Sequence, residues 1–177
     1  INSVKLKDCD GLVSAGNTGA LMAISKFVLK TIKAIDRPAI AALMPTMKGQ
    51  TVILDLGANV ECSSENLVQF AIMGDMFSRS VLGIKRPKLG LLNVGSEQIK
   101  GNTVVKKTFD DLKKMNSKIN FFGFVEGNDI NKGVVDVIVT DGFSGNIALK
   151  TAEGVAELIF TFLKNAYASS LISKVGY

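Results

Sequence analysis

The chain has 177 residues, of which 47% are apolar, and its 21 lysines and arginines outnumber 16 aspartates and glutamates to give a net charge of +5. This length suits one domain with a hydrophobic core, and the composition is that of a folded cytosolic protein rather than a disordered one. Charged residues interrupt every apolar run well before the roughly 18 residues that a membrane-spanning helix needs, so no such helix is expected.

The residue types that are missing or rare restrict the chemistry. Histidine is absent, and the two cysteines, Cys9 and Cys62, lie far apart in the sequence. A disulfide framework and a zinc site of the usual Cys/His kind are therefore not expected, and we predict no metal site. Catalytic triads that depend on histidine are excluded too. Chemistry in this chain must use backbone amides, carboxamides, hydroxyls, lysines and carboxylates.

The chain begins with an apolar run at residues 11–14, which predicts a strand, and a helix is expected to follow from about Ala20. Further strands are expected at residues 39–43 and 51–55. The connection between those two is too short for a helix and contains Pro45 and Gly49, which suit a turn. We therefore predict an antiparallel hairpin within an otherwise mostly parallel sheet.

The second half of the chain continues the alternation of helices and strands. A helical pattern over Ser64–Leu82 places Leu67, Phe70, Ala71 and Gly74 on one face,. Strands are then expected at residues 88–93, 119–125 and 135–140. Such alternation predicts an α/β fold of three layers, with helices on both faces of a mixed, mostly parallel sheet.

The last helix has the clearest amphipathic pattern. Its apolar residues follow the spacing i, i+3, i+4, i+7, i+8, i+11, and they are Val155, Leu158, Ile159, Phe162, Leu163 and Ala166,. Three surfaces are candidates to cover this face: the core, a dimer partner or lipid. The core and a dimer partner are favoured, because such a face needs a partner in any soluble protein. No repeat or linker divides residues 1–177, so we expect a single α/β domain, and we expect it to be the central part of a longer chain with both termini missing.

Small and polar residues follow five of the apolar runs. In an open α/β sheet, ligands bind outside the carboxyl ends of the strands, where such loops gather. Glycine, asparagine and serine are also ordinary turn residues, so only the recurrence at one edge indicates a site. The five loops are residues 14–19, 55–59, 93–97, 126–129 and 141–146.

Two of these loops run into helices, and a helix N-terminus is a natural site for phosphate. Neither the dinucleotide-binding nor the P-loop motif is present, so no nucleotide cofactor is expected. Lys100 lies just past a strand end, and Lys150 is one turn into the last helix. The residues predicted to bind phosphate are Gly16, Asn17, Thr18, Gly19, Ser144, Gly145, Asn146 and Lys150.

Four basic residues, Lys26, Lys30, Lys33 and Arg37, are spaced by 4, 3 and 4 along the first helix or its end,. Such a stripe is either the solvated side of an amphipathic helix or a docking surface for an acidic protein. A possible extension consists of Arg79, Lys85, Arg86 and Lys88. Nucleic acid is a poorer partner, because no aromatic residues alternate with these basic ones.

Taken together, the loops resemble phosphate acyltransferases of the PlsX type. The matching segments follow one another in family order and cover most of the chain. They are residues 10–20 (DGLVSAGNTGA), 36–40 (DRPAI), 54–60 (LDLGANV), 69–74 (QFAIMG), 90–95 (GLLNVG), 100–101 (KG) and 141–146 (DGFSGN).

The resemblance implies transfer of a long-chain acyl group from acyl carrier protein to inorganic phosphate, for phospholipid synthesis. It also implies a homodimer with a fold like isopropylmalate dehydrogenase and phosphotransacetylase, without a cofactor. The implied location is the cytoplasm, with peripheral attachment to the membrane, where a glycerol-3-phosphate acyltransferase uses the acyl phosphate. Two family segments, one at each end, have no counterpart here, and Ser63-Ser64 stands where many members have Lys-Pro.

This chemistry is compatible with a site that lacks histidine. Phosphate is already partly dianionic near neutral pH, and a thiol leaves readily, so positioning and oxyanion donors suffice. We expect Asn59, Asn93 or Lys100 to polarise the thioester carbonyl, and Lys26, Lys30, Lys33 and Arg37 to dock the carrier. The alternatives are a decarboxylating dehydrogenase, a phosphotransacetylase-like enzyme acting on acyl-CoA, and a non-catalytic module that binds acyl groups or acidic proteins.

Overall fold

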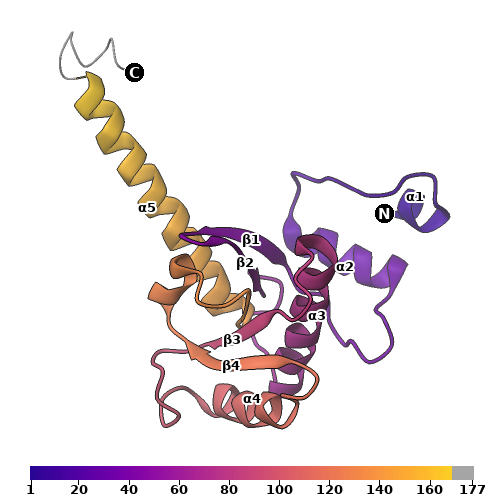
Figure 1. Cartoon of the computed structure of the whole chain (residues 1–177). Coiled ribbons are helices and arrows are strands. Elements are labelled where there is room, and N and C mark those ends of the chain that lie inside the picture. The colour runs from indigo at the N-terminus through magenta and orange to yellow at the C-terminus, as the bar shows by residue number, and fades with distance from the viewer. Residues whose placement is uncertain (169–177) are drawn as a thin grey trace.

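The computed structural model describes residues 1–168 of the chain as strands alternating with helices around one sheet (Figure 1). The elements run in the order α1 (Asn2–Leu6), α2 (Thr18–Leu29), β1 (Ala41–Thr46), β2 (Gly49–Leu54), α3 (Ser64–Leu82), β3 (Lys88–Leu92), α4 (Thr103–Lys114), β4 (Asn120–Val125), the 3₁₀ helix η1 (Gly127–Lys132), β5 (Val137–Val139) and α5 (Gly142–Ala168).

The five strands form one mixed sheet in the order β1-β2-β5-β3-β4. β1 and β2 make the predicted antiparallel hairpin, with Ala41 opposite Leu54 and Thr46 opposite Gly49. All other neighbouring strands are parallel. The carboxyl ends of β2, β5, β3 and β4 therefore point to the same edge, which is the edge where the sequence predicts a site.

The strand predicted at residues 11–14 is wrong. These residues form an irregular loop, in which Val13 is fully exposed and Leu12 is half exposed. A strand is stable only when a neighbour satisfies its backbone groups, and no strand of the described chain lies beside this run. α1 and α2 contact each other to one side of the sheet (Figure 1), and neither helix has a buried residue.

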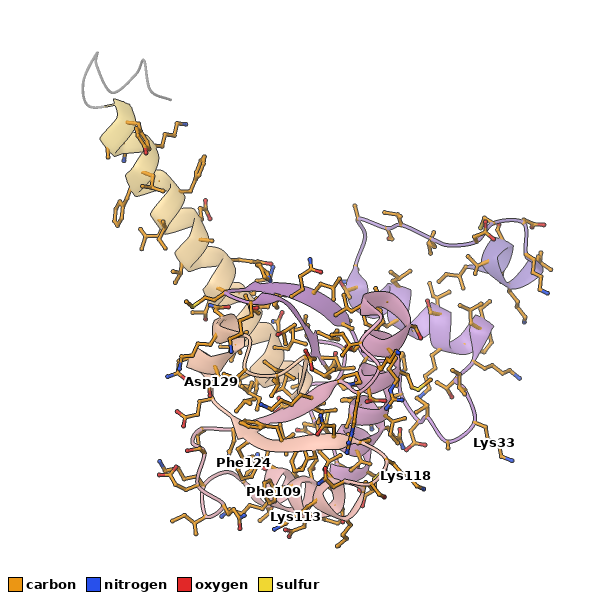
Figure 2. The ribbon with its side chains drawn as sticks, viewed as in Figure 1. Lys33, Phe109, Lys113, Lys118, Phe124 and Asp129 are labelled. Carbon is orange, nitrogen blue, oxygen red and sulfur yellow. The ribbon has the colours of Figure 1, made fainter. Side chains whose placement is uncertain are left out.

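One face of the sheet is covered by α3 and α4. The predicted face of α3 is buried: Leu67, Phe70, Ala71 and Gly74 all lie against the strands or within the core. A Cβ on Gly74 would lie 2.6 Å from a side-chain carbon of Val137, so this helix approaches the sheet more closely than any larger residue would permit. Next to them, Phe109 of α4 packs on Phe124 of β4, with ring centroids 4.6 Å apart (Figure 2).

The opposite face is covered by η1 and the first turns of α5, which enclose Ile53, Leu56, Ile130 and Ile138. Helices therefore lie on both faces, as predicted. After those turns α5 leaves the sheet and extends away from the rest of the molecule (Figure 1), and every residue from position 153 to 168 is exposed. The interpretation that the apolar face of this helix packs in the core of the same chain is wrong for the described residues.

Within residues 1–168, no helix is both long enough and apolar enough to cross a membrane. α5 has the length, with 27 residues, but lysines and glutamates recur along it.

Candidate functional site

The loops that follow the strands meet at the carboxyl edge of the sheet and line two neighbouring hollows. We call the first the cationic groove; it has a volume of about 310 Å³ and is lined by Thr18, Gly19, Met22, Ala23, Lys26, Arg37, Pro38, Gly57, Ala58 and Asn59. We call the second the polar hollow; it measures about 270 Å³ and is lined by Leu92, Asn93, Val94, Gly101, Asn102, Val105, Gly127, Asp141 and Ser144. All five loops predicted from the sequence contribute to one or the other.

The loop after β2 is organised by Asp55, whose carboxylate is fully buried. One oxygen accepts hydrogen bonds from the backbone N–H groups of Ile40 (2.9 Å) and Ala58 (3.1 Å). The other accepts from the backbone N–H (2.7 Å) and the side-chain amide (2.9 Å) of Asn59. Such a set of donors compensates for burial of the carboxylate and fixes the course of residues 55–59.

The start of α5 packs directly on this loop. A Cβ on Gly142 would lie 2.6 Å from the backbone oxygen of Asn59, and a Cβ on Gly145 would overlap the backbone oxygen of Asp55. Any side chain at either glycine would push helix and loop apart. Asn146 lies close by, since its side chain is 3.4 Å from where a Cβ of Gly57 would stand. α5 therefore begins at Gly142, and Ser144, Gly145 and Asn146 belong to its first turns rather than preceding it.

The N-terminus of α5 is already capped. The Asp141 carboxylate accepts hydrogen bonds from the backbone N–H of Ser144 (2.8 Å) and from its hydroxyl (3.0 Å). The backbone N–H of Gly145 donates to the carbonyl oxygen of Asp141. These contacts use donors that the sequence assigns to phosphate, and they place a carboxylate beside them.

The N-terminus of α2 is different, because only an amide side chain caps it. Asn17 Oδ1 accepts from the backbone N–H of Ala20 at 3.0 Å, and Thr18 and Gly19 at the helix start line the cationic groove. Lys26 lines the groove from two turns further along the same helix. Arg37 lines it from the segment before β1 and donates to the backbone oxygen of Glu61 at 3.3 Å. Two cations and a helix N-terminus thus surround one groove, an arrangement suited to an anion.

The polar hollow contains a residue that the sequence analysis missed. Asn102 caps α4, since its Oδ1 accepts from the backbone N–H of Val105 at 2.8 Å. It lines both the polar hollow and a third hollow of about 530 Å³ that also contains Cys62 and Asp141. The signal was present: an asparagine followed by threonine before an amphipathic segment is typical of a helix start.

The side-chain amides of the predicted catalytic residues are engaged in holding loops. Asn59 donates to Asp55 and also to the backbone oxygen of Pro38, at 2.8 Å. Asn93 donates to the backbone oxygens of Gly95 (3.0 Å) and Lys100 (3.2 Å). Each carboxamide has two N–H groups, so both residues use their donors within the protein.

Lys100 is the remaining candidate for a catalytic donor. Its ammonium lies 2.9 Å from Glu97, and this hydrogen bond raises the pKa of Lys100 and lowers the pKa of Glu97. Both side chains are about half exposed, so solvent screens the ion pair and Lys100 can leave Glu97 at little cost in free energy,. An ammonium has three hydrogens to donate, so the contact with Glu97 leaves Lys100 able to bind a second acceptor.

The other predicted lysines do not converge on the site. Lys150 pairs with Glu153 at 2.7 Å, which directs its ammonium toward the C-terminal side of α5. α2 ends at Leu29, so Lys30 is its C-cap, and Lys33 lies in the loop that follows and points away from the strand ends (Figure 2). The stripe of Lys26, Lys30, Lys33 and Arg37 is thus divided: the first and last line the cationic groove, and the middle two are outside it.

Cys62 lies close to the site but is not poised as a nucleophile. Burial is the main cause that raises the pKa of its thiol, and nearby Asp55 and Asp141 act in the same direction. The thiol donates to the backbone oxygen of Asn59 at 3.4 Å. A thiol, rather than the more reactive thiolate, is therefore favoured. Within residues 1–168, no cluster of three or more histidines, cysteines and carboxylates is placed to hold a metal ion.

Comparison with known proteins gives the family. A family model described as fatty acid synthesis protein matches residues 1–177. Proteins named phosphate acyltransferase are 59% identical in Paramagnetospirillum magneticum and 60% identical in Rhodospirillum centenum, in each case over the whole of this chain and 50% of the relative. A phosphate acyltransferase of Methylococcus capsulatus is 55% identical over 99% of the chain and 51% of its own length. The chain thus spans about half the length of these relatives.

Among solved structures, the EutD phosphotransacetylase from Staphylococcus aureus matches 88% of this chain and 54% of its own, with a TM-score of 0.67 and 20% sequence identity. At that identity the match concerns the fold, and it confirms the predicted phosphotransacetylase-like architecture. With the match of the family model over every residue, it also confirms the resemblance drawn from the strand-end loops. The chain belongs to the fatty acid synthesis protein family and is similar throughout to phosphate acyltransferases of the PlsX type.

Proposed function

We propose that the protein to which this chain belongs transfers a long-chain acyl group from acyl carrier protein to inorganic phosphate, giving an acyl phosphate for phospholipid synthesis. The names of the relatives support acyl transfer to phosphate. The observation that carries the proposal for these residues is the cationic groove. There the start of α2, Lys26 and Arg37 surround a space that fits an anion, beside the loop that follows β2.

The reaction needs little from the protein beyond placement. A phosphate oxygen attacks the thioester carbonyl carbon, the new C–O bond forms, and the C–S bond breaks. The carrier thiolate leaves with the electron pair and takes up a proton. Because phosphate is already an anion near neutral pH and a thiolate is a good leaving group, neither a strong base nor a strong acid is required. Cations that hold phosphate and a donor at the developing oxyanion supply the catalysis.

The proposed roles follow the geometry. Phosphate binds at the start of α2, where Thr18 and Gly19 line the groove. Asn17 and Gly16, whose backbone N–H donates to the Ser14 hydroxyl, lie just before the helix and remain proposed ligands. Asn146, which lies beside Gly57, supports the same groove. Lys100, which directly precedes Gly101 of the polar hollow, polarises the thioester carbonyl, because its ammonium has hydrogens left to donate, whereas Asn59 and Asn93 already donate theirs within the protein. Ser144, Gly145 and Lys150 remain proposed phosphate ligands, and in this arrangement they act only after their contacts with Asp141 and Glu153 have opened.

The proposed partners come from the family resemblance. Acyl carrier protein docks on Lys26, Lys30, Lys33 and Arg37, and the exposed apolar face of α5 meets a second copy in a homodimer. The protein acts in the cytoplasm and attaches peripherally to the membrane, where a glycerol-3-phosphate acyltransferase consumes the acyl phosphate. Leu158 and Phe162 are 51% and 63% exposed, so α5 presents the apolar surface that a dimer requires,.

The test is phosphate-dependent release of carrier thiol from long-chain acyl carrier protein, measured with the protein at the full length of its relatives. Release that occurs with acetyl-CoA and not with the acyl carrier protein would support a phosphotransacetylase instead. No release with either donor would contradict the proposal.

The residues proposed to bind phosphate or to shape its groove are tested by three single variants: Asn17→Ala, Asn59→Ala and Asn146→Ala. We expect each to reduce kcat/KM at least about tenfold, since each removes a group that binds phosphate or shapes its groove. Asn116→Ala, on the turn before β4 at the opposite edge of the sheet, is the matched control and should keep its activity. Near-normal rates for all three site variants would contradict the assignment of the cationic groove as the phosphate site.

A further inference from the structure

The most deeply buried charged group at the strand ends takes no part in the steps proposed above. Asp55 is fully buried, directly after β2, and its two oxygens accept four hydrogen bonds. A carboxylate is costly to bury, and an apolar residue or a small polar residue would fill this position more cheaply if only a turn were needed. The position of its four donors indicates what the carboxylate does.

The donors belong to both walls of the cationic groove. Ala58 and Asn59 belong to the wall formed by the loop after β2, and Ile40 lies on the segment that leads from Arg37 into β1. Asn59 adds a second link between the walls, since its side-chain amide bridges from Asp55 to the backbone oxygen of Pro38. The two walls are separate in sequence, and the Asp55 carboxylate joins them beside the backbone hydrogen bond from the Leu56 N–H to the Ile40 oxygen.

Arg37 is the cation most directly affected by this connection. It lies immediately before Pro38, which is tied to Asp55 through Asn59, and its guanidinium reaches across to the backbone oxygen of Glu61. If the two walls separated, the guanidinium would lose its fixed place over the groove. Lys26 would be unaffected, because α2 carries it and no bond to Asp55 is involved.

We propose that Asp55 is a positioning residue that determines the affinity for phosphate by holding Arg37 and the 57–59 loop on opposite sides of the groove. This inference rests on the proposed function of the groove as the phosphate site. It assigns Asp55 no contact with either substrate. Asp55 therefore affects the binding of phosphate and has little effect on the rate of the chemical step.

The substitution that tests this is Asp55→Asn, which keeps the shape of the side chain. One oxygen becomes an NH₂ group, so in either orientation two of the four N–H groups lose their acceptor and face a donor instead. In the full-length protein we expect KM for phosphate to rise about tenfold while kcat changes less than about threefold. Asp136→Asn makes the same change to the carboxylate that accepts from the Lys88 backbone N–H at the opposite edge, and it serves as the control for loss of a partly buried carboxylate.

A double-mutant cycle with Arg37→Met separates positioning from a general structural effect. If Asp55 acts through Arg37, Asp55→Asn should raise KM for phosphate much less in the Arg37→Met background than in the wild type. Equal fold-changes in the two backgrounds would mean that Asp55 is only structural and would overturn the inference. An unchanged KM in Asp55→Asn would overturn it as well.

Asn59→Ala provides the test if Asp55→Asn does not fold. It removes the side-chain hydrogen bonds to Asp55 and Pro38 and leaves the three backbone N–H contacts of Asp55, so a rise of about tenfold in KM for phosphate with unchanged kcat supports the inference,. A fall in kcat without a change in KM would instead make Asn59 a catalytic donor and overturn it. The wild-type rate tests the proposed function separately, because that function fails when no phosphate-dependent release occurs at all, whatever the variants do.

Discussion

The helices α3 and α5 have the same kind of amphipathic sequence and opposite surroundings. In both, apolar residues recur at three- and four-residue intervals. In α3 this face is in the core, where Leu67 and Phe70 are at most 1% exposed. In α5 the corresponding residues, Leu158 and Phe162, are at least half exposed. Periodicity therefore predicts that a helix forms and which face is apolar, but the topology decides what covers that face.

The difference follows from the paths of the two helices. α3 runs back across the sheet, so its buried face lies against β2 and β5. α5 is anchored only at its start, by the close contacts of Gly142 and Gly145, and its later turns leave the sheet (Figure 1). Two pairs of measurements would sharpen this contrast or remove it, and a third pair tests what holds α3 against α4.

The largest expected effect is in α3. Phe70→Ala removes a fully buried ring and should reduce the free energy of unfolding by about 4 kcal/mol, because the cavity cannot collapse against the sheet,. Phe162→Ala changes a ring that is 63% exposed and should cost about 0.5 kcal/mol or less in dilute solution,. Urea unfolding of both variants gives the comparison. A similar cost for both would show that another surface covers α5 in solution.

The next effect distinguishes the anchored start of α5 from its protruding part. Gly145→Ala places a methyl group against the backbone oxygen of Asp55 and should destabilise the protein by about 3 kcal/mol,. Gly154→Ala meets no atom within 4 Å and should stabilise it by about 0.5 kcal/mol, because alanine favours a helix interior,. Thermal unfolding should give opposite signs for the two variants. The same sign for both would contradict the contrast within this helix.

The smallest effect concerns an ion pair between α3 and α4. The hydrogen bond from Lys107 is the main cause that lowers the pKa of Glu65 from 4.5 to about 2. A carboxyl whose pKa is lowered on folding stabilises the protein above the pKa of the unfolded state, and this contribution is lost as the pH falls from about 4.5 toward 2. Lys107→Met should return the pKa of Glu65 toward 4.5, with little change in stability at pH 7, since both side chains are well exposed,.

An NMR titration of the Glu65 carboxyl measures this shift directly. Lys118→Met, in the turn before β4, is the control and should leave the pKa of Glu65 where it is. An unchanged pKa in Lys107→Met would mean that the ion pair does not form in solution. The contact between α3 and α4 would then depend on their apolar residues alone.

The sequence was sufficient for the elements that carry strong local signals. The hairpin was predicted because the connection between residues 43 and 51 is too short for a helix, and a helix over about residues 64–82 was predicted because its apolar residues follow a helical spacing,. The strand expected at residues 11–14 failed because an apolar run of four residues does not specify a partner.

The candidate site was predictable in its place but not in its contacts. Glycine and asparagine at the strand ends located the edge of the sheet, and the structure brings Asn59 and Asn93 there. The partners of those amides, Pro38 and Gly95, are backbone oxygens, which no residue pattern specifies. The spacing of Lys26, Lys30, Lys33 and Arg37 misled for a related reason. It assumes a helix that continues to Arg37, whereas α2 ends at Leu29.

The two glycines that seat α5 have a mechanical consequence. Because Gly142 and Gly145 put backbone directly against backbone, no side chain lies between them that would absorb a shift by changing its rotamer. The 27 residues of α5 form a rod about 40 Å long, and its N-terminal end is fixed to the loop that follows β2,. A partner that binds the C-terminal turns of α5 therefore also displaces the loop after β2, which lines the cationic groove.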